Sequence, residues 1–215
     1  MKRDAVVEKI LAGIIKAQEE YLKWENVSVS HGPEYLLTVN IAKELATLGD
    51  NFKPSLEINV KNVAQDAGIT SRLSHSKRCI TGRGDIVIYK NEIPFGIIEV
   101  KNGVYRLDKI KNDIERIDYL VSKQKSKTSW KFGIIAFLID IDLLVKENQD
   151  IVQKLKNKIS NLFEEARKKS DLVRDYHYDI KWETYELNGK QRWKLWWSYE
   201  KSYENSCRSK NSRAN

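Results

Sequence analysis

The chain has few of the residues that mark secreted, zinc-binding or membrane proteins. Its two cysteines, Cys79 and Cys207, have no Cys-x-x-Cys spacing, so neither a zinc site nor a disulfide framework is indicated. The most apolar stretch, residues 132–145, is interrupted by Asp140 and Asp142 and is too short to span a bilayer. The N-terminus has no signal-peptide pattern, because charged residues run through its apolar positions. We therefore expect a cytoplasmic protein with no membrane partner.

A glycine-rich phosphate-binding loop is also missing, so the chain is not itself a translocase. What it does contain indicates a folded protein with an anionic partner. A hydrophobic fraction of 41% and six Trp exclude a disordered chain. The net charge of +8 favours a polyanion, because Lys and Arg that neutralise phosphates release condensed counterions. We predict a single domain over residues 1–200 and a basic, polar tail over residues 201–215.

The clearest local pattern is a pair of short apolar strands with charged ends. Residues 86–89 and 95–100 are rich in β-branched and aromatic side chains, and the polar residues 90–92 between them are typical of a turn. We therefore predict an antiparallel hairpin. A turn centred near residues 91 and 92 sets Asp85 across from residue 98 or 99.

Three charged side chains are expected to meet at the open end of this hairpin. Side chains alternate along a strand, so Glu99 and Lys101 project to one side and Val100 to the other, with Asp85 nearby. Two carboxylates beside an apolar sheet are costly unless a positive group lies between them. Carboxylate oxygens without neighbouring Cys or His favour Mg²⁺ or Mn²⁺ over zinc. Lys101 would then hold or help deprotonate a water, or neutralise charge on a phosphate.

The order of these residues resembles the signature of the PD-(D/E)XK nuclease superfamily. Asp85 precedes Glu99-Val100-Lys101 at the end of the next strand, and Gly84 stands where the signature has proline. Residues 83–102 are similar to the nuclease domain of type I restriction motor subunits.

The resemblance implies a restriction-endonuclease-like α/β sandwich, with a mixed central β-sheet flanked by helices. It also implies that Asp85, Glu99 and the Val100 carbonyl ligate the metal, and that Asp85, Glu99 and Lys101 are catalytic. The competing interpretation is a hairpin whose terminal charges are merely solvated.

Two further acidic residues compete to complete the site. Pro33 opens a helix that residues 35–48 continue, and Glu34 in its first turn complements the helix dipole in any protein. The resemblance gives Glu34 a catalytic alternative, because the family often takes an acidic residue from a helix ahead of the core sheet. Glu57 lies in a predicted strand over residues 55–63, where some relatives have an acidic residue. A solvent-facing strand position explains Glu57 equally well.

A basic, Ser- and Gly-containing segment separates that strand from Asp85. Clustered positive charge on a loop beside a carboxylate site suits a nucleic-acid backbone. The predicted nucleic-acid contacts are Arg72, Lys77, Arg78 and Arg83.

The remaining segments supply the layers of an α/β fold. Apolar residues at helical spacing predict helices over residues 6–21, 107–121 and 146–172, and residues 130–139 predict a central strand buried on both faces. On the second of these helices, Asp113 and Arg116 are three residues apart and can pair with each other.

The C-terminal region predicts a second hairpin. Asn188-Gly189 between alternating strands is the favoured two-residue turn, and counting outward from it sets Trp182 opposite Leu195 and Ile180 opposite Trp197. We therefore add a C-terminal β-hairpin over residues 177–199 to the predicted fold.

The predicted function is hydrolysis of phosphodiester bonds in DNA by a Mg²⁺- or Mn²⁺-dependent endonuclease, with restriction or defence as its setting. DNA is preferred because the local similarity is to restriction enzymes. The alternatives are an RNA- or structure-specific nuclease, a nucleic-acid-binding module of the same fold without cleavage activity, and a protein whose basic surface meets an acidic partner. A homodimer and a separate motor or methyltransferase partner remain open.

Overall fold

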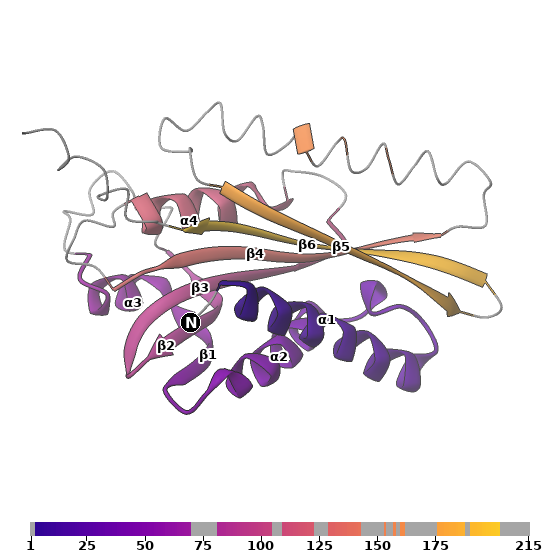
Figure 1. Cartoon of the computed structure of the whole chain (residues 1–215), viewed down its shortest axis with the longest axis horizontal. Helices are drawn as coiled ribbons and strands as arrows, with labels where there is room; N and C mark the ends of the chain where they lie inside the picture. Colours follow the sequence, from indigo (N-terminus) through magenta and orange to yellow (C-terminus); the bar gives the residue numbers. More distant parts are fainter. Residues whose placement is uncertain are drawn as a thin grey trace, which may run out of the picture.

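Helices and strands combine in an α/β fold (Figure 1). The computed structural model describes residues 3–69, 81–104, 109–122, 129–142, 176–187 and 190–202, together with residues 153, 157, 160 and 161. In chain order the elements are α1 (Arg3–Glu25), η1 (Val29–His31), α2 (Glu34–Leu45), η2 (Ala46–Leu48), β1 (Phe52–Asn59), α3 (Val60–Asp66), β2 (Arg83–Lys90), β3 (Ile93–Asn102), α4 (Lys111–Ser122), β4 (Phe132–Asp142), β5 (Tyr176–Leu187) and β6 (Lys190–Ser202). No helix in these ranges has the length and apolar character that a membrane span requires.

Strands β1 to β4 form a mixed sheet, which β6 and β5 extend beyond β4 in the order β1-β2-β3-β4-β6-β5. The β3–β4 pair is parallel, and the other four pairs are antiparallel. Helices α1 and α2 cover one face of the sheet, and α3 and α4 pack on the other (Figure 1). The predicted mixed sheet flanked by helices is therefore confirmed at this level.

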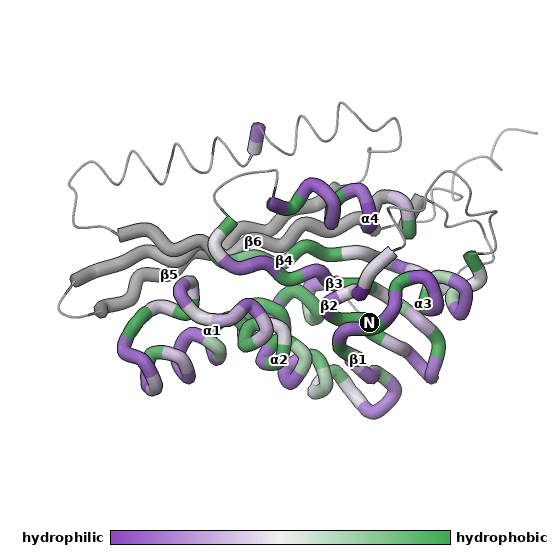
Figure 2. Tube along the Cα trace, turned by 180° about the vertical axis from the view of Figure 1, so that it is seen from behind, coloured by the Kyte–Doolittle hydropathy of each residue, from purple (hydrophilic) through white to green (hydrophobic). Residues whose placement is uncertain are grey.

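The core lies on both faces of the sheet, because side chains alternate along each strand. Ile135 and Phe137 of β4 pack with α3 and α4, whereas Ile134, Ala136 and Leu138 pack with α1 and α2. Figure 2 shows this apolar character along β2, β3 and β4 between the helices. The predicted central strand buried on both faces is confirmed.

The two helices on the first face approach each other closely. Gly13 of α1 lies against the backbone of α2, where a Cβ atom would collide with Ile41 and with the Asn40 carbonyl oxygen. Only glycine permits this contact, which brings α2 down onto the sheet with its first turn beside the end of β3.

The predicted β2–β3 hairpin is confirmed, including its turn. Asn91 and Glu92 have φ angles of 51° and 63°, the left-handed pair of a two-residue turn that matches strand twist. After a register shift between Ile88 and Tyr89, the register pairs Ile86 with Ile98, and the Asp85 carboxylate accepts a hydrogen bond from the Val100 N–H. This geometry carries the charged residues of both strands to one end of the sheet.

The strand predicted over residues 55–63 is wrong at its C-terminal end. Strand β1 ends at Asn59, and α3 begins at Val60. The Asn59 side chain accepts hydrogen bonds from the backbone N–H groups of Lys61 and Asn62, at 3.0 and 3.3 Å, which is a helix N-cap. The apolar residues after it are buried at helical spacing, so they favour a helix over a continued strand.

The C-terminal hairpin has the predicted register, with Trp182 opposite Leu195 and Ile180 opposite Trp197. Its turn, residues 188–189, lies outside the described residues, as does most of the helix predicted over residues 146–172. The sequence did not predict which strand this hairpin pairs with, and the structure pairs β6 with β4 along the whole of β4. Strand β6 continues to Ser202, two residues into the predicted tail.

Candidate active site

Lys101 lies at the C-terminal end of β3, surrounded by oxygen atoms from four elements. Its Nζ atom is 3.4 Å from Glu34 Oε1, 3.4 Å from Asp85 Oδ2 and 3.8 Å from Asp113 Oδ2. It also donates a hydrogen bond of 2.9 Å to the Val100 carbonyl oxygen. The Lys101 side chain is 22% exposed, so solvent or a ligand can reach it.

The fold explains how these groups meet. Asp85 belongs to β2, and its Oδ2 atom accepts a 2.7 Å hydrogen bond from the Val100 N–H across the β2–β3 pair. Glu34 is the first residue of α2 on one face of the sheet, and Asp113 lies in the first turn of α4 on the other face. Side chains from both helical layers thus reach the same strand end.

Glu99 has a different partner from Lys101. Its carboxylate is almost fully buried, at 1% exposure, and accepts a 2.6 Å hydrogen bond from Arg116 Nη1. The same nitrogen donates to the Arg83 carbonyl oxygen at 3.2 Å and lies 3.9 Å from Asp113 Oδ1. Arg116 therefore ties the start of β2 to the end of β3 from the α4 side of the sheet.

Burial is the largest influence on the pKa of the Glu99 carboxyl group. It raises the pKa of this carboxyl to about 8, with Asp85 and Asp113 adding to the effect and Arg116 opposing it. Burial likewise raises the pKa of Asp113, against the attraction of Lys101 and Arg116. Burial therefore favours the protonated form of Glu99 in the metal-free protein.

The pKa of Lys101 is also raised, which for an amine favours the charged form. Burial acts to lower its pKa, but Asp113, Asp85, Glu34 and Glu99 together outweigh burial and raise it. Lys101 is therefore an ammonium group at neutral pH. An ammonium group can orient a water molecule or stabilise a phosphate oxygen, whereas it cannot accept a proton.

The structure brings together most of the residues that the sequence proposed. Glu34, Asp85 and the Val100 carbonyl oxygen contact Lys101, while Glu99 is held next to them by Arg116.

Glu57 does not join this cluster. It is exposed and has a φ of 54°, at a position that the β1–β2 pairing skips between Leu56↔Ile86 and Ile58↔Gly84. In the part of the chain that the structure describes, Glu57 makes no hydrogen bond or ion pair with these groups. Of the two competing carboxylates, Glu34 is the one that reaches Lys101.

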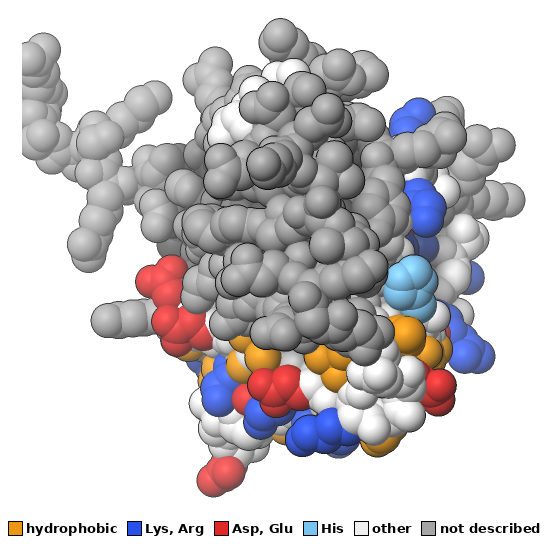
Figure 3. Space-filling model, turned by 90° about the vertical axis from the view of Figure 1, so that its right-hand side faces the viewer, with side chains coloured by type: hydrophobic (Ala, Val, Ile, Leu, Met, Phe, Trp, Pro, Cys, Tyr) orange, Lys and Arg blue, Asp and Glu red, His pale blue; other side chains and the backbone are white. Residues whose placement is uncertain are grey.

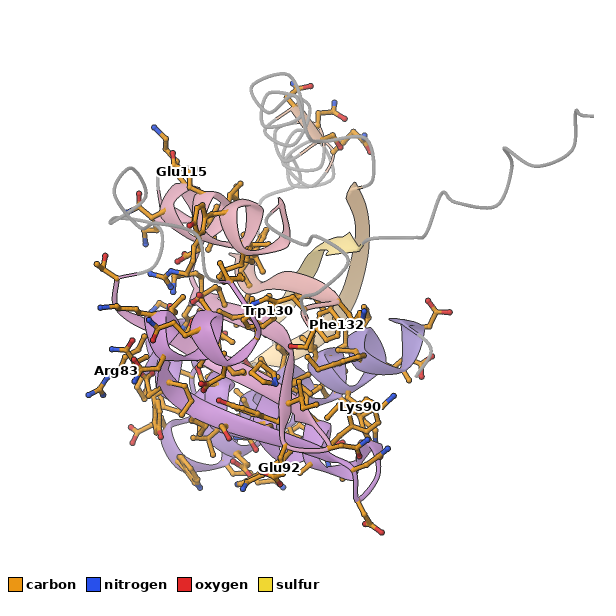
Figure 4. All side chains as sticks on the ribbon, turned by 90° about the vertical axis from the view of Figure 1, so that its left-hand side faces the viewer. Arg83, Lys90, Glu92, Glu115, Trp130 and Phe132 are labelled. Carbon is orange, nitrogen blue, oxygen red and sulfur yellow. The ribbon has the colours of Figure 1, made fainter. Side chains whose placement is uncertain are left out.

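Of the four cations predicted to contact nucleic acid, Arg72, Lys77 and Arg78 lie outside the described residues. The Arg83 side chain is exposed and projects away from the sheet (Figure 4). On the face drawn in Figure 3, basic and acidic side chains of the described residues lie intermixed.

The sequence missed the roles of Asp113 and Arg116. It expected them to pair with each other, and they are 3.9 Å apart, but Arg116 makes its shorter contact with Glu99 and Asp113 also approaches Lys101. A signal was present in the pattern of α4. The buried apolar positions of this helix include Ile114 and Ile117, and Asp113 and Arg116 each directly precede one of them.

The donor set fits a hard divalent cation by its chemistry. The atoms around Lys101 Nζ are three carboxylate oxygens and one backbone carbonyl oxygen, which are the ligands that Mg²⁺ and Mn²⁺ prefer. Four carboxylates of the site face only two cationic side chains, Lys101 and Arg116. In their present positions, no three Asp, Glu, His or Cys side chains of the described residues are grouped to hold a metal ion.

No family model, curated protein or solved structure matches this chain.

Proposed function

We propose that this protein is a metal-dependent nuclease that hydrolyses phosphodiester bonds in DNA, on a restriction-endonuclease-like fold. The observation that carries the proposal is the position of Lys101. Its ammonium group contacts two carboxylates and a backbone carbonyl at the end of β3, in a mixed sheet with helices on both faces. The motif from Asp85 to Lys101 supports the same conclusion from the sequence.

Asp85, Glu99 and the Val100 carbonyl would hold a Mg²⁺ or Mn²⁺ ion, with Glu34 as the carboxylate that completes the set. Bound there, the metal would lower the pKa of a coordinated water and provide a hydroxide nucleophile near neutral pH. Arg116 would keep Glu99 in place at the strand end, because its guanidinium group already bridges Glu99 and the Arg83 backbone.

Lys101 would act as a charged hydrogen-bond donor. Its raised pKa keeps it an ammonium group, so its role is to orient the attacking water and to stabilise negative charge that develops on the phosphate. The net charge of +8 supports attraction of the DNA backbone by cations outside this acidic cluster, Arg83 among them.

A second candidate is a nucleic-acid-binding module without cleavage activity. It is favoured by the pairing of Glu99 with Arg116, which occupies a carboxylate that a nuclease would direct to the metal. Such a module would bind DNA with a strong salt dependence and would not need Lys101.

The test compares Lys101→Ala with Lys43→Ala, an exposed lysine on α2 that makes no side-chain contact with the cluster. Supercoiled plasmid, linear duplex, single-stranded DNA and RNA are incubated with Mg²⁺, Mn²⁺ or EDTA. We expect metal-dependent cleavage by the wild type and by Lys43→Ala, and a loss of at least about 100-fold in Lys101→Ala with DNA binding retained. Normal cleavage by Lys101→Ala refutes the mechanism. Salt-dependent binding without cleavage by the wild type supports the second candidate.

A further inference from the structure

Asn102, directly after Lys101, makes three hydrogen bonds to the segment that leads into α2. Its backbone N–H donates to Glu34 Oε2 at 2.8 Å. Its side-chain Nδ2 donates to the Val29 carbonyl at 2.8 Å and to the Gly32 carbonyl at 3.1 Å. We propose that Asn102 is a positioning residue that holds Glu34 against Lys101, an inference that rests on the proposed function.

The two oxygens of Glu34 are held by consecutive residues of β3. Oε1 contacts the Lys101 ammonium, and Oε2 accepts from the Asn102 N–H. The Glu34 side chain is 41% exposed, so packing alone does not select its rotamer. Its orientation therefore depends on where the backbone of α2 begins relative to the end of β3.

The start of α2 has no side-chain cap at Pro33, the residue before it, and the Leu36 N–H donates to the Pro33 carbonyl oxygen at 3.0 Å. The segment is anchored on its other side by Gln18, a buried residue of α1 whose Oε1 accepts from Ser28 Oγ at 3.2 Å and from the Val29 N–H at 3.0 Å. Asn102 completes this attachment on the β3 side.

The Asn102 amide suits this role by its chemistry. Both side-chain bonds use Nδ2 as the donor to backbone carbonyls, while Oδ1 is buried and accepts no hydrogen bond in the described structure. A carboxylate of the same shape would direct an oxygen at two carbonyl oxygens and repel them. Asn102→Asp therefore tests the bonds with little change in volume, and Asn102→Ala removes them.

The core of this face does not require these bonds, because α1 and α2 pack on the sheet through apolar side chains such as Ile14, Leu37 and Ile41. Loss of the Asn102 amide should thus loosen residues 28–36 without unfolding the helical layer. The first measurement is amide hydrogen exchange of the metal-free protein. We expect exchange at least about 10-fold faster over residues 28–36 in both Asn102 variants, and unchanged exchange over residues 6–17. Unchanged exchange over residues 28–36 overturns the proposal.

The second measurement is a double-mutant cycle with Asn102→Ala and Glu34→Ala. Its readouts are the metal-dependent kcat and KM for duplex DNA, and the Tm shift caused by Mn²⁺ without DNA. We expect Asn102→Ala to lower kcat about 10-fold with little change in KM and to reduce the Mn²⁺ shift. In the Glu34→Ala background it should change neither quantity. Equal effects in both backgrounds overturn the proposal, because Asn102 then does not act through Glu34.

The outcomes separate this proposal from the nuclease proposal. A wild-type protein that cleaves no substrate refutes the nuclease, and the exchange data and the Mn²⁺ cycle still decide the role of Asn102. A wild-type protein that cleaves DNA, with additive effects of the two substitutions, refutes the positioning role alone. Absence of both cleavage and a Mn²⁺ shift refutes the nuclease and its metal site, and the exchange data alone then decide whether Asn102 holds residues 28–36.

Discussion

Replacing Glu99 by Gln is expected to stabilise the metal-free protein progressively as the pH rises from 5 to 8. Burial raises the pKa of Glu99 from 4.5 to about 8, with Asp85 and Asp113 adding and Arg116 opposing. Between these two pH values the folded protein holds a proton that the unfolded chain has released. The contribution of Glu99 to stability is therefore fully present below pH 4.5 and is lost as the pH rises toward 8.

The magnitude follows from proton linkage. One bound proton changes the free energy of unfolding by about 1.4 kcal/mol per pH unit, so the loss over the whole interval is at most about 5 kcal/mol. Gln has no proton to lose and keeps the shape of the side chain, and its Oε1 can still accept from Arg116. Where wild-type Glu99 holds its proton it gives Arg116 no counter-charge either, and the attraction of Arg116 for the ionised form is already part of the raised pKa.

The assay is urea unfolding in EDTA at pH 5, 6, 7 and 8. The difference in unfolding free energy between Glu99→Gln and wild type should rise with pH, at up to about 1.4 kcal/mol per unit. Glu57→Gln is the matched control, because it makes the same chemical change at an exposed position of β1. A flat or falling difference for Glu99→Gln would mean that Arg116 outweighs burial and keeps Glu99 ionised.

Two further predictions use the same unfolding assay. Arg116→Met should cost about 1–3 kcal/mol, because the buried Glu99 side chain and the Arg83 carbonyl oxygen lose their hydrogen bond from the guanidinium group; an unchanged free energy of unfolding contradicts this. Gly13→Ala should cost about 1–3 kcal/mol, because the new Cβ would collide with the backbone of Ile41. Helix propensity alone predicts the opposite sign, so stabilisation would show that the helices separate freely.

The sequence predicted the helices and hairpins that depend on the spacing of residues close together in the chain. The apolar residues at three- and four-residue spacing predicted α1, and the two-residue turns predicted both hairpins. Because a turn of known length sets the pairing of the strands around it, the register of β5 and β6 followed from counting outward from Asn188-Gly189. In the first hairpin the same argument set Asp85 across from residue 98 or 99, and a register shift between Ile88 and Tyr89, which counting does not predict, leads to the pairing of Ile86 with Ile98.

Alternation also predicted that Glu99 and Lys101 leave β3 on the same side. Alternation could not identify the side chains that Glu99 and Lys101 contact. Glu99 is bound by Arg116, from a helix that begins nine residues after β3 ends, whereas Lys101 reaches Glu34, which is 67 residues away in sequence. Such contacts depend on how α2 and α4 pack on opposite faces of the sheet.

The strand predicted through residue 63 failed for a related reason, since a short apolar run is compatible with either a strand or a helix. The cap by Asn59 and the burial of Val60 and Val63 at helical spacing decided for a helix. This shortened β1.

The sequence by itself thus determined the hairpins, the main helices and the motif from Asp85 to Lys101, because each depends on spacing along the chain. Only the tertiary structure showed that Glu34 contacts Lys101 and that Glu57 is exposed in β1, and only it revealed the contacts of Asp113 and Arg116 and the anchoring bonds of Asn102. These choices depend on which helix ends meet the end of β3, and the packing of two apolar layers sets that geometry.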